Sequence, residues 1–146
     1  CYFYGRGVAQ NYYTAVSWYQ KSADQGNVDA QSNLGWCYLN GHGVALNYKT
    51  AVYWLKKAAD QGQSYGQLNL GYCYEYGYGV TQNYYTAVSW YQKSANQGND
   101  TAQCNLGLCY YYGRGVAKNY NTAKSWFQMA ANQGNQKAID FLNNNY

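Results

Sequence analysis

The chain repeats itself with a period of 36 residues, and this period limits its fold more than any other feature. Glycine recurs in this register at Gly5, Gly41, Gly77 and Gly113. Tryptophan recurs at Trp18, Trp54, Trp90 and Trp126, and no insertion or deletion shifts the register. A unit of this length buries its apolar face only by packing against the next unit. The period therefore predicts an elongated array rather than a globule.

Each unit contains two stretches of helical periodicity separated by a turn. The first, helix A, is predicted over residues 28–39, and the second, helix B, over residues 48–60. Gly41 and Gly62 follow the two stretches, as expected where helices end. Asn47 and its counterparts precede helix B, so we predict that they cap its N-terminus.

Helix A carries a glycine at its centre in three units, as Gly35, Gly71 and Gly107. A glycine inside a helix costs about 0.5–1 kcal/mol relative to alanine. Its recurrence at one position predicts that helix B of the same hairpin approaches too closely for a side chain.

One unit contains the residues Ala30, Leu34-Gly35, Tyr38, Gly41-x-Gly43-Val44, Ala51, Trp54, Ala58-Ala59 and Gly62, and the other units repeat most of them. This pattern resembles the Sel-one-like repeat (SLR) family, a relative of the tetratricopeptide repeat. The resemblance implies an all-α, right-handed α/α superhelical solenoid of helix-turn-helix repeats whose concave face is lined by the A helices. It also implies scaffold and protein-interaction roles without a shared catalytic activity. Gly66 stands where other units have alanine, and we expect it to weaken its helix locally.

The units divide the chain into a single repeat array. The predicted segments are a partial first repeat over 1–26, full repeats over 27–62, 63–98 and 99–134, and a degenerate C-terminal capping helix over 135–146. Polar residues replace apolar ones in the last segment; Asp140, for example, stands where Cys104 stands one unit earlier. A polar terminal helix is what a capping unit needs in order to face water.

No catalytic grouping recurs, so we predict that the chain is not an enzyme and needs no cofactor. His42 is the single histidine, and its counterparts in the Gly-x-Gly turn are Arg6, Tyr78 and Arg114. We interpret His42 as a solvated turn residue. A nucleophile–base pair would need a nucleophile and an orienting acid around it, and the sequence indicates neither.

Four of the five cysteines share one repeat position on the buried stripe of helix A: Cys1, Cys37, Cys73 and Cys109. Adjacent packed helices lie about 8–10 Å apart, whereas a disulfide needs Cα atoms within about 7 Å. We therefore predict reduced, buried thiols. No Cys/His spacing suggests zinc, so no metal site is predicted.

Charge and hydropathy bear on partners and location. The net charge of +4 is spread along the chain without the dense basic stripe that nucleic-acid binders show, so no nucleic-acid partner is predicted. No apolar run approaches the ~20 residues of a membrane span. The sequence begins in mid-pattern at Cys1 and lacks a targeting region, so the compartment, secreted or cytoplasmic, stays open. Asn99 begins the one N-glycosylation sequon, which matters only in a secreted protein.

By analogy with tetratricopeptide geometry, a concave groove is predicted along the A helices. Its residues are Phe3, Tyr4, Trp36, Leu39, Asn40, Tyr65, Leu68, Tyr72, Glu75, Tyr76, Leu108, Tyr111 and Tyr112. Rigid aromatic side chains favour binding of an extended peptide or a helix of a protein partner. One alternative is a structural protein that stacks head to tail into a filament, since residues 5–36 and 77–108 differ at only seven of 32 positions. A second alternative is a secreted glycan-binding repeat protein.

Overall fold

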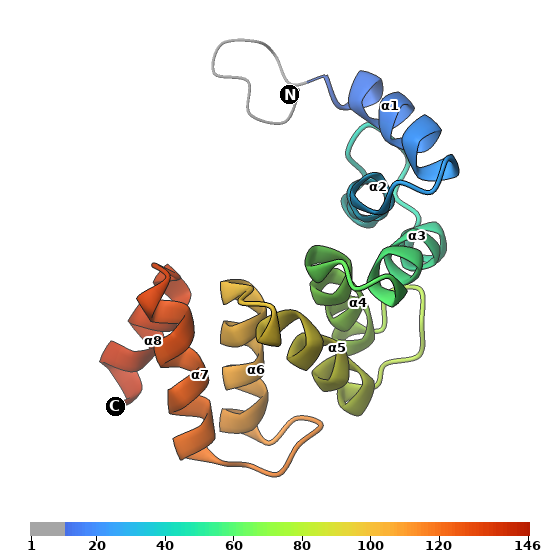
Figure 1. The fold of residues 1–146 in the computed structure, drawn as a ribbon. Helices are drawn as coiled ribbons and strands as arrows, with labels where there is room; N and C mark the ends of the chain where they lie inside the picture. Colours follow the sequence, from blue (N-terminus) through green and yellow to red (C-terminus); the bar gives the residue numbers. More distant parts are fainter. Residues whose placement is uncertain (1–10) are drawn as a thin grey trace.

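A computed structural model describes residues 11–146, and these residues form eight α-helices and no strands (Figure 1). In chain order the helices are α1 (Tyr12–Asp24), α2 (Val28–Asn40), α3 (Tyr48–Asp60), α4 (Ser64–Tyr76), α5 (Tyr84–Asn96), α6 (Asp100–Tyr112), α7 (Tyr120–Asn132) and α8 (Gln136–Asn145). The predicted helices A and B of the second unit correspond to α2 and α3, with α2 one residue longer than expected. The all-α solenoid is thus confirmed.

The helices form hairpins that pack one on the next along an arc. Helices α2 and α3, α4 and α5, and α6 and α7 pair within units, while α3 packs on α4 and α5 on α6. Helix α2 also contacts α4, its counterpart in the next unit. Figure 1 shows α2 and α4 toward the inner side of the arc, with α3 and α5 outside them.

Asparagine caps begin the B helices. In α3, the Thr50 N–H donates to Asn47 Oδ1 at 3.0 Å, and the same contact begins α1, α5 and α7. The predicted caps are therefore confirmed. Side chains also cap helices α2, α4, α6 and α8, which the sequence analysis did not identify; Asn99 Oδ1, for example, accepts from the Ala102 N–H at 2.9 Å.

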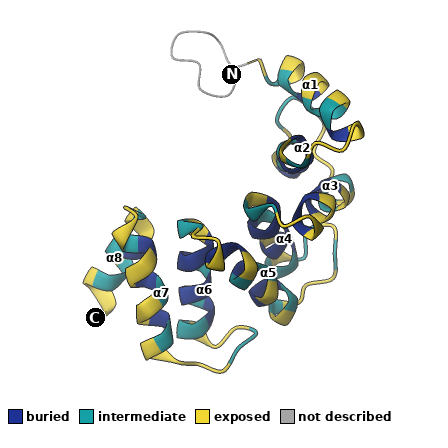
Figure 2. Ribbon diagram, viewed as in Figure 1, coloured by how far each residue is buried: buried dark blue, intermediate teal, exposed yellow. Residues whose placement is uncertain are grey.

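The mid-helix glycines lie where each hairpin is tightest. A Cβ on Gly35 would lie 2.7 Å from Leu55 Cγ, and a Cβ on Gly71 would lie 2.7 Å from Tyr91 Cδ1. Both contacts are within one hairpin, as the sequence predicts, and the buried residues line these interior faces (Figure 2). Gly66 has a packing role too, because its Cβ would lie 2.9 Å from Ala58 Cβ on the preceding hairpin. Gly66 thus permits a close approach of α3 and α4, and the local weakening of α4 stays a prediction.

In the three Gly-x-Gly turns that the structure describes, the second glycine fits against the preceding unit. Gly79 has a φ of +70°, and a Cβ there would collide with the main-chain carbonyl of Tyr48, at the start of α3. Gly43 and Gly115 meet Tyr12 and Tyr84 in the same way. The turn between α4 and α5 therefore packs directly against the main chain of the preceding unit.

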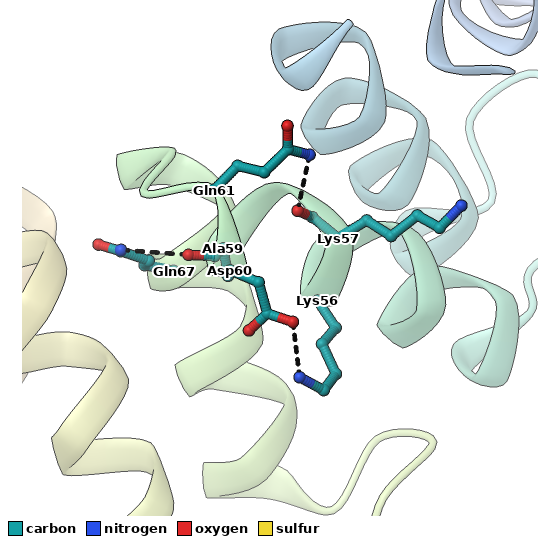
Figure 3. Close-up of polar contacts among 6 residues, drawn as sticks. All are labelled: Lys56, Lys57, Ala59, Asp60, Gln61 and Gln67. Atoms are coloured by element: carbon teal, nitrogen blue, oxygen red, sulfur yellow. Dashed lines mark hydrogen bonds and ion pairs between the residues drawn. The ribbon is translucent and has the colours of Figure 1, made fainter. Parts of the chain in front are cut away.

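Buried glutamines connect successive helices through their amides. The Gln67 Nε2 donates to the Ala59 carbonyl at 3.3 Å (Figure 3), and its Oε1 accepts from Gln97 Nε2 at 2.8 Å. The same pair of bonds recurs one unit earlier with Gln31 and Gln61, and Gln61 also donates to the Lys57 carbonyl at 3.0 Å (Figure 3). This glutamine relay gives the Ala59 carbonyl, at the C-terminal end of α3, a second donor beside the Gly62 N–H at 3.0 Å.

Helix α8 covers the last hairpin. The Phe141 ring stacks on Phe127 with centroids 4.3 Å apart, and Ala138 is fully buried. Its other side is polar and exposed, with Lys137, Asp140 and Asn144 facing solvent.

Candidate partner-binding surface

The structure divides the predicted groove residues into three groups. Phe3 and Tyr4 lie outside the described residues. Leu39 and Leu68 are only 7% and 9% exposed and belong to core clusters, so they leave little surface for a partner. The remaining positions keep accessible surface on the A helices: Trp36, Asn40, Tyr65, Tyr72, Glu75, Tyr76, Leu108, Tyr111 and Tyr112.

Four rings from α4, the turn after it and the start of α3 form a group that we call the tyrosine cluster: Tyr48, Tyr72, Tyr76 and Tyr78. Tyr72 and Tyr76 on α4 have centroids 4.5 Å apart, and Tyr78 stacks on Tyr48 at 4.6 Å. Tyr76 is half exposed, whereas Tyr48 packs against the core. Partial burial is the main cause that raises the pKa of Tyr72 and Tyr76, so both hydroxyls stay protonated at neutral pH and can donate hydrogen bonds.

The turn residue between the two glycines belongs to this ring system, which the sequence analysis missed. Tyr78 is the turn residue of one unit, and His42 occupies the same position one unit earlier. The His42 ring stacks between Tyr12, at 4.8 Å, and Trp36, at 4.7 Å. The prediction of a solvated turn residue is therefore wrong for His42, which is half-buried between two rings. A sign of this contact was available in the sequence, because the position between the two glycines varies from unit to unit, as His42, Tyr78 and Arg114.

Tyr111 contributes mainly to packing between helices and less to the exposed surface. Its ring makes edge contacts with Phe141 at 4.9 Å and Tyr120 at 5.0 Å, and its hydroxyl donates to Asn145 Oδ1 at 3.4 Å. Tyr111 thus fixes α8 against α6, while neighbouring Tyr112 remains about half exposed.

Glu75 introduces a negative charge beside the tyrosine cluster. Its Oε2 accepts a hydrogen bond of 2.6 Å from the Tyr91 hydroxyl, and its Oε1 lies 3.7 Å from Arg114 Nη1. Burial first, and the carboxylate of Glu75 second, raise the pKa of Tyr91, so this hydroxyl remains a donor. The Arg114 guanidinium lies 5.1 Å from the centre of the Tyr112 ring. The sequence analysis placed Glu75 in the groove but did not bring Tyr91 or Arg114 to it.

The cysteines on the helix A stripe are buried and reduced, as predicted for Cys37, Cys73 and Cys109; Cys1 lies outside the described residues. Burial raises the pKa of Cys37 to about 11 and that of Cys73 to about 12. The protonated thiols act as small apolar groups in the core.

These thiols should make the fold sensitive to alkali. Because the folded-state pKa of Cys73 lies above its ordinary value of 9.0, its stabilising contribution is complete below pH 9.0 and is lost as pH rises to about 12. In that window each such thiol should lower the free energy of unfolding by about 1.4 kcal/mol per pH unit. Urea unfolding of wild type and Cys73→Ala across the window measures this, since tyrosine and lysine titration is common to both. Equal slopes would contradict the assignment.

Residues 11–146 hold no group of three His, Cys, Asp or Glu side chains arranged to ligate a metal. Within the same residues, none of the helices combines the length and apolar character needed to cross a bilayer. Asn99 of the sequon caps α6 through its Oδ1.

Family and structural comparisons agree with this geometry. A family model described as Sel1 repeat matches residues 1–27, 28–63, 64–99 and 100–135. No curated protein sequence matches the chain.

Solved structures similar to the chain include the following three. One is a protective antigen of uropathogenic Escherichia coli strains that displays an SLR fold, with 38% identity and a TM-score of 0.87 over 97% of this chain and 30% of that one. Another is a Sel1 repeat protein from Oxalobacter formigenes, with 36% identity and a TM-score of 0.88 over 99% of this chain and 59% of that one. The chain thus spans only part of the length of both. Helicobacter pylori cysteine rich protein B, at 24% identity and a TM-score of 0.70 over 94% of this chain and 99% of that one, shares the fold.

Proposed function

Because the chain belongs to the Sel1 repeat family, whose members are typically protein-interaction scaffolds, we propose that its A-helix face binds an extended peptide or a helix of a protein partner. The observation that carries this proposal is the tyrosine cluster. Tyr72 and Tyr76 are 37% and 50% exposed although they lie in a ring-on-ring arrangement. Tyrosine offers a large contact area at low entropic cost, because its side chain has only two rotatable bonds.

The scaffold role also fits the distribution of polar groups. The A-helix face joins exposed rings to the mostly buried carboxylate of Glu75. Hydrogen-bond donors and acceptors among apolar surface give a binding site its specificity. Sel1 repeat proteins are generally non-catalytic. A non-catalytic binding face therefore accounts for the side chains on the A helices.

The filament alternative, in which another unit stacks on α7, has less support than the peptide-binding face. On α5, Val88 is 8% exposed and belongs to a core cluster that the following hairpin shares. Its counterpart on α7 is Lys124, which is exposed and lies with its Nζ 5.0 Å from the centre of the Tyr146 ring. A further hairpin docked here would bury a charge in place of an apolar group, which costs free energy.

The proposal predicts that Tyr76→Ala weakens partner binding about tenfold while leaving the thermal unfolding midpoint nearly unchanged, since aromatic anchors carry much of an interface's energy. Binding is measured with a peptide selected from a random display library. Tyr85→Ala is the matched control, because Tyr85 is 77% exposed but lies on α5. Trp36 is a poorer test than the sequence suggests, since it packs against the core beside Leu34.

Three outcomes would count against a peptide-binding face. Equal loss of affinity in Tyr76→Ala and Tyr85→Ala would show that the contact is not specific to the A helices. Concentration-dependent fibres in light scattering would favour filament assembly. Binding of neutral oligosaccharides, abolished by Tyr76→Ala, would favour a glycan partner.

A further inference from the structure

Glu75 is the only glutamate in the chain, and it stands where the other described units have apolar or aromatic residues. Its counterparts are Leu39 and Tyr111. The Glu75 side chain is only 13% exposed, and withdrawing a carboxylate from water is costly unless it gains partners. Packing of α4 alone does not require this charge, since Leu39 fills the same place in α2 as a buried apolar residue.

The two carboxylate oxygens are unequally satisfied. Oε2 accepts the short bond from the Tyr91 hydroxyl at 2.6 Å, which fixes the orientation of the carboxylate. Oε1 faces Arg114 at 3.7 Å, which is longer than a hydrogen bond between charged groups. The Arg114 side chain is itself 48% exposed, so it holds the carboxylate only loosely.

The surroundings of Oε1 suit a planar cation. Arg114 already holds its guanidinium near both the Tyr112 ring and the carboxylate, which shows the kind of group that fits there. On α4, Tyr72 lies three residues before Glu75 and therefore on the same side of the helix, and its ring contacts that of Tyr76 with centroids 4.5 Å apart. Guanidinium groups stack on aromatic rings and bind carboxylates with two parallel hydrogen bonds, which an ammonium cannot do.

We propose that Glu75 is the receptor for an arginine side chain of the partner segment, which displaces Arg114 and stacks among Tyr72, Tyr76 and Tyr112. This inference rests on the proposed function of the A-helix face and adds the chemistry of its occupant. In the unbound chain Arg114 neutralises the carboxylate, and on binding it moves into solvent. Tyr91 keeps the carboxylate oriented in both states.

Selection of short random peptides against the wild-type chain by display tests the proposal. Peptides that compete with one another and lose affinity in Tyr76→Ala define the groove binders. Among them we expect arginine to be enriched, and replacement of that arginine by the neutral isostere citrulline should lower affinity about tenfold. In Glu75→Gln, which keeps an acceptor for Tyr91, arginine and citrulline peptides should bind equally well.

Arg114→Gln provides the opposite test. Removing the competing guanidinium should strengthen binding of the arginine peptide, whereas a merely structural Glu75–Arg114 pair would weaken it. Circular dichroism melts establish that both variants are folded. Groove binders without arginine enrichment, or a citrulline effect that persists in Glu75→Gln, would overturn the arginine site and leave the proposed function standing. Failure to select any peptide sensitive to Tyr76→Ala would overturn the proposed function itself.

Discussion

Replacement of Gly79 by alanine should lower the free energy of unfolding by about 3 kcal/mol or more, because two separate costs coincide there. A φ of +70° is strained for any residue with a Cβ. The added methyl would also meet the Tyr48 carbonyl, and a main-chain atom cannot rotate away as a side chain can. Urea unfolding followed by circular dichroism measures the loss.

Gly98→Ala separates the two costs. Gly98 has a φ of +91°, but a Cβ there would have nothing within 4 Å, so only the conformational strain of about 1–2 kcal/mol applies. The turn that contains Gly79 packs against Tyr48 of the preceding unit. Gly79→Ala should therefore also broaden the unfolding transition, as expected when coupling between repeats is lost. Equal destabilisation by the two variants would show that the turn does not press on Tyr48.

Gly71→Leu should destabilise the chain by about 3–5 kcal/mol or prevent folding, because overpacking a filled core forces backbone movement. The Cβ alone would lie 2.7 Å from the Tyr91 ring, which is fully buried and tied to Glu75 by its hydroxyl. The ring therefore has nowhere to move, and α4 must separate from α5. Thermal unfolding by circular dichroism measures the effect.

Ser89→Leu is the matched control for Gly71→Leu, since Ser89 lies on the exposed side of α5. It adds the same side chain to a neighbouring helix without entering a contact, and its melting should remain near wild type. Near-native melting of Gly71→Leu would mean that α4 and α5 are not in close contact at this position.

Features that repeat along the chain could be predicted from the sequence. The helix bounds, the Asn47-type caps, the Gly71-type close contacts and the buried thiols each recur every 36 residues, so each is visible as a pattern. Their physical causes lie within one unit or in its contact with an identical neighbour. Comparing the units therefore identifies what the fold requires.

Features specific to one junction could not be predicted. The convergence of Glu75, Tyr91 and Arg114 depends on how α4, α5 and the following turn are placed, and nothing recurring marks it. The groove prediction also included Leu39 and Leu68, because helical periodicity does not reveal how far the neighbouring unit covers the inner face. The Gln67 relay was missed although its residues recur, since the bond from Gln67 to the Ala59 carbonyl crosses from one hairpin to the preceding one.

The glutamine relay has a consequence for how such a chain changes length. At successive junctions between units a glutamine amide donates to the carbonyl at the same repeat position of the preceding hairpin, as Gln31 to Ala23 and Gln67 to Ala59. Deleting or duplicating one whole period rejoins a donor to an equivalent acceptor and leaves no orphaned polar group at the seam. Gene-level gain or loss of a unit is therefore structurally silent at the seam, whereas an insertion of any other length would not be.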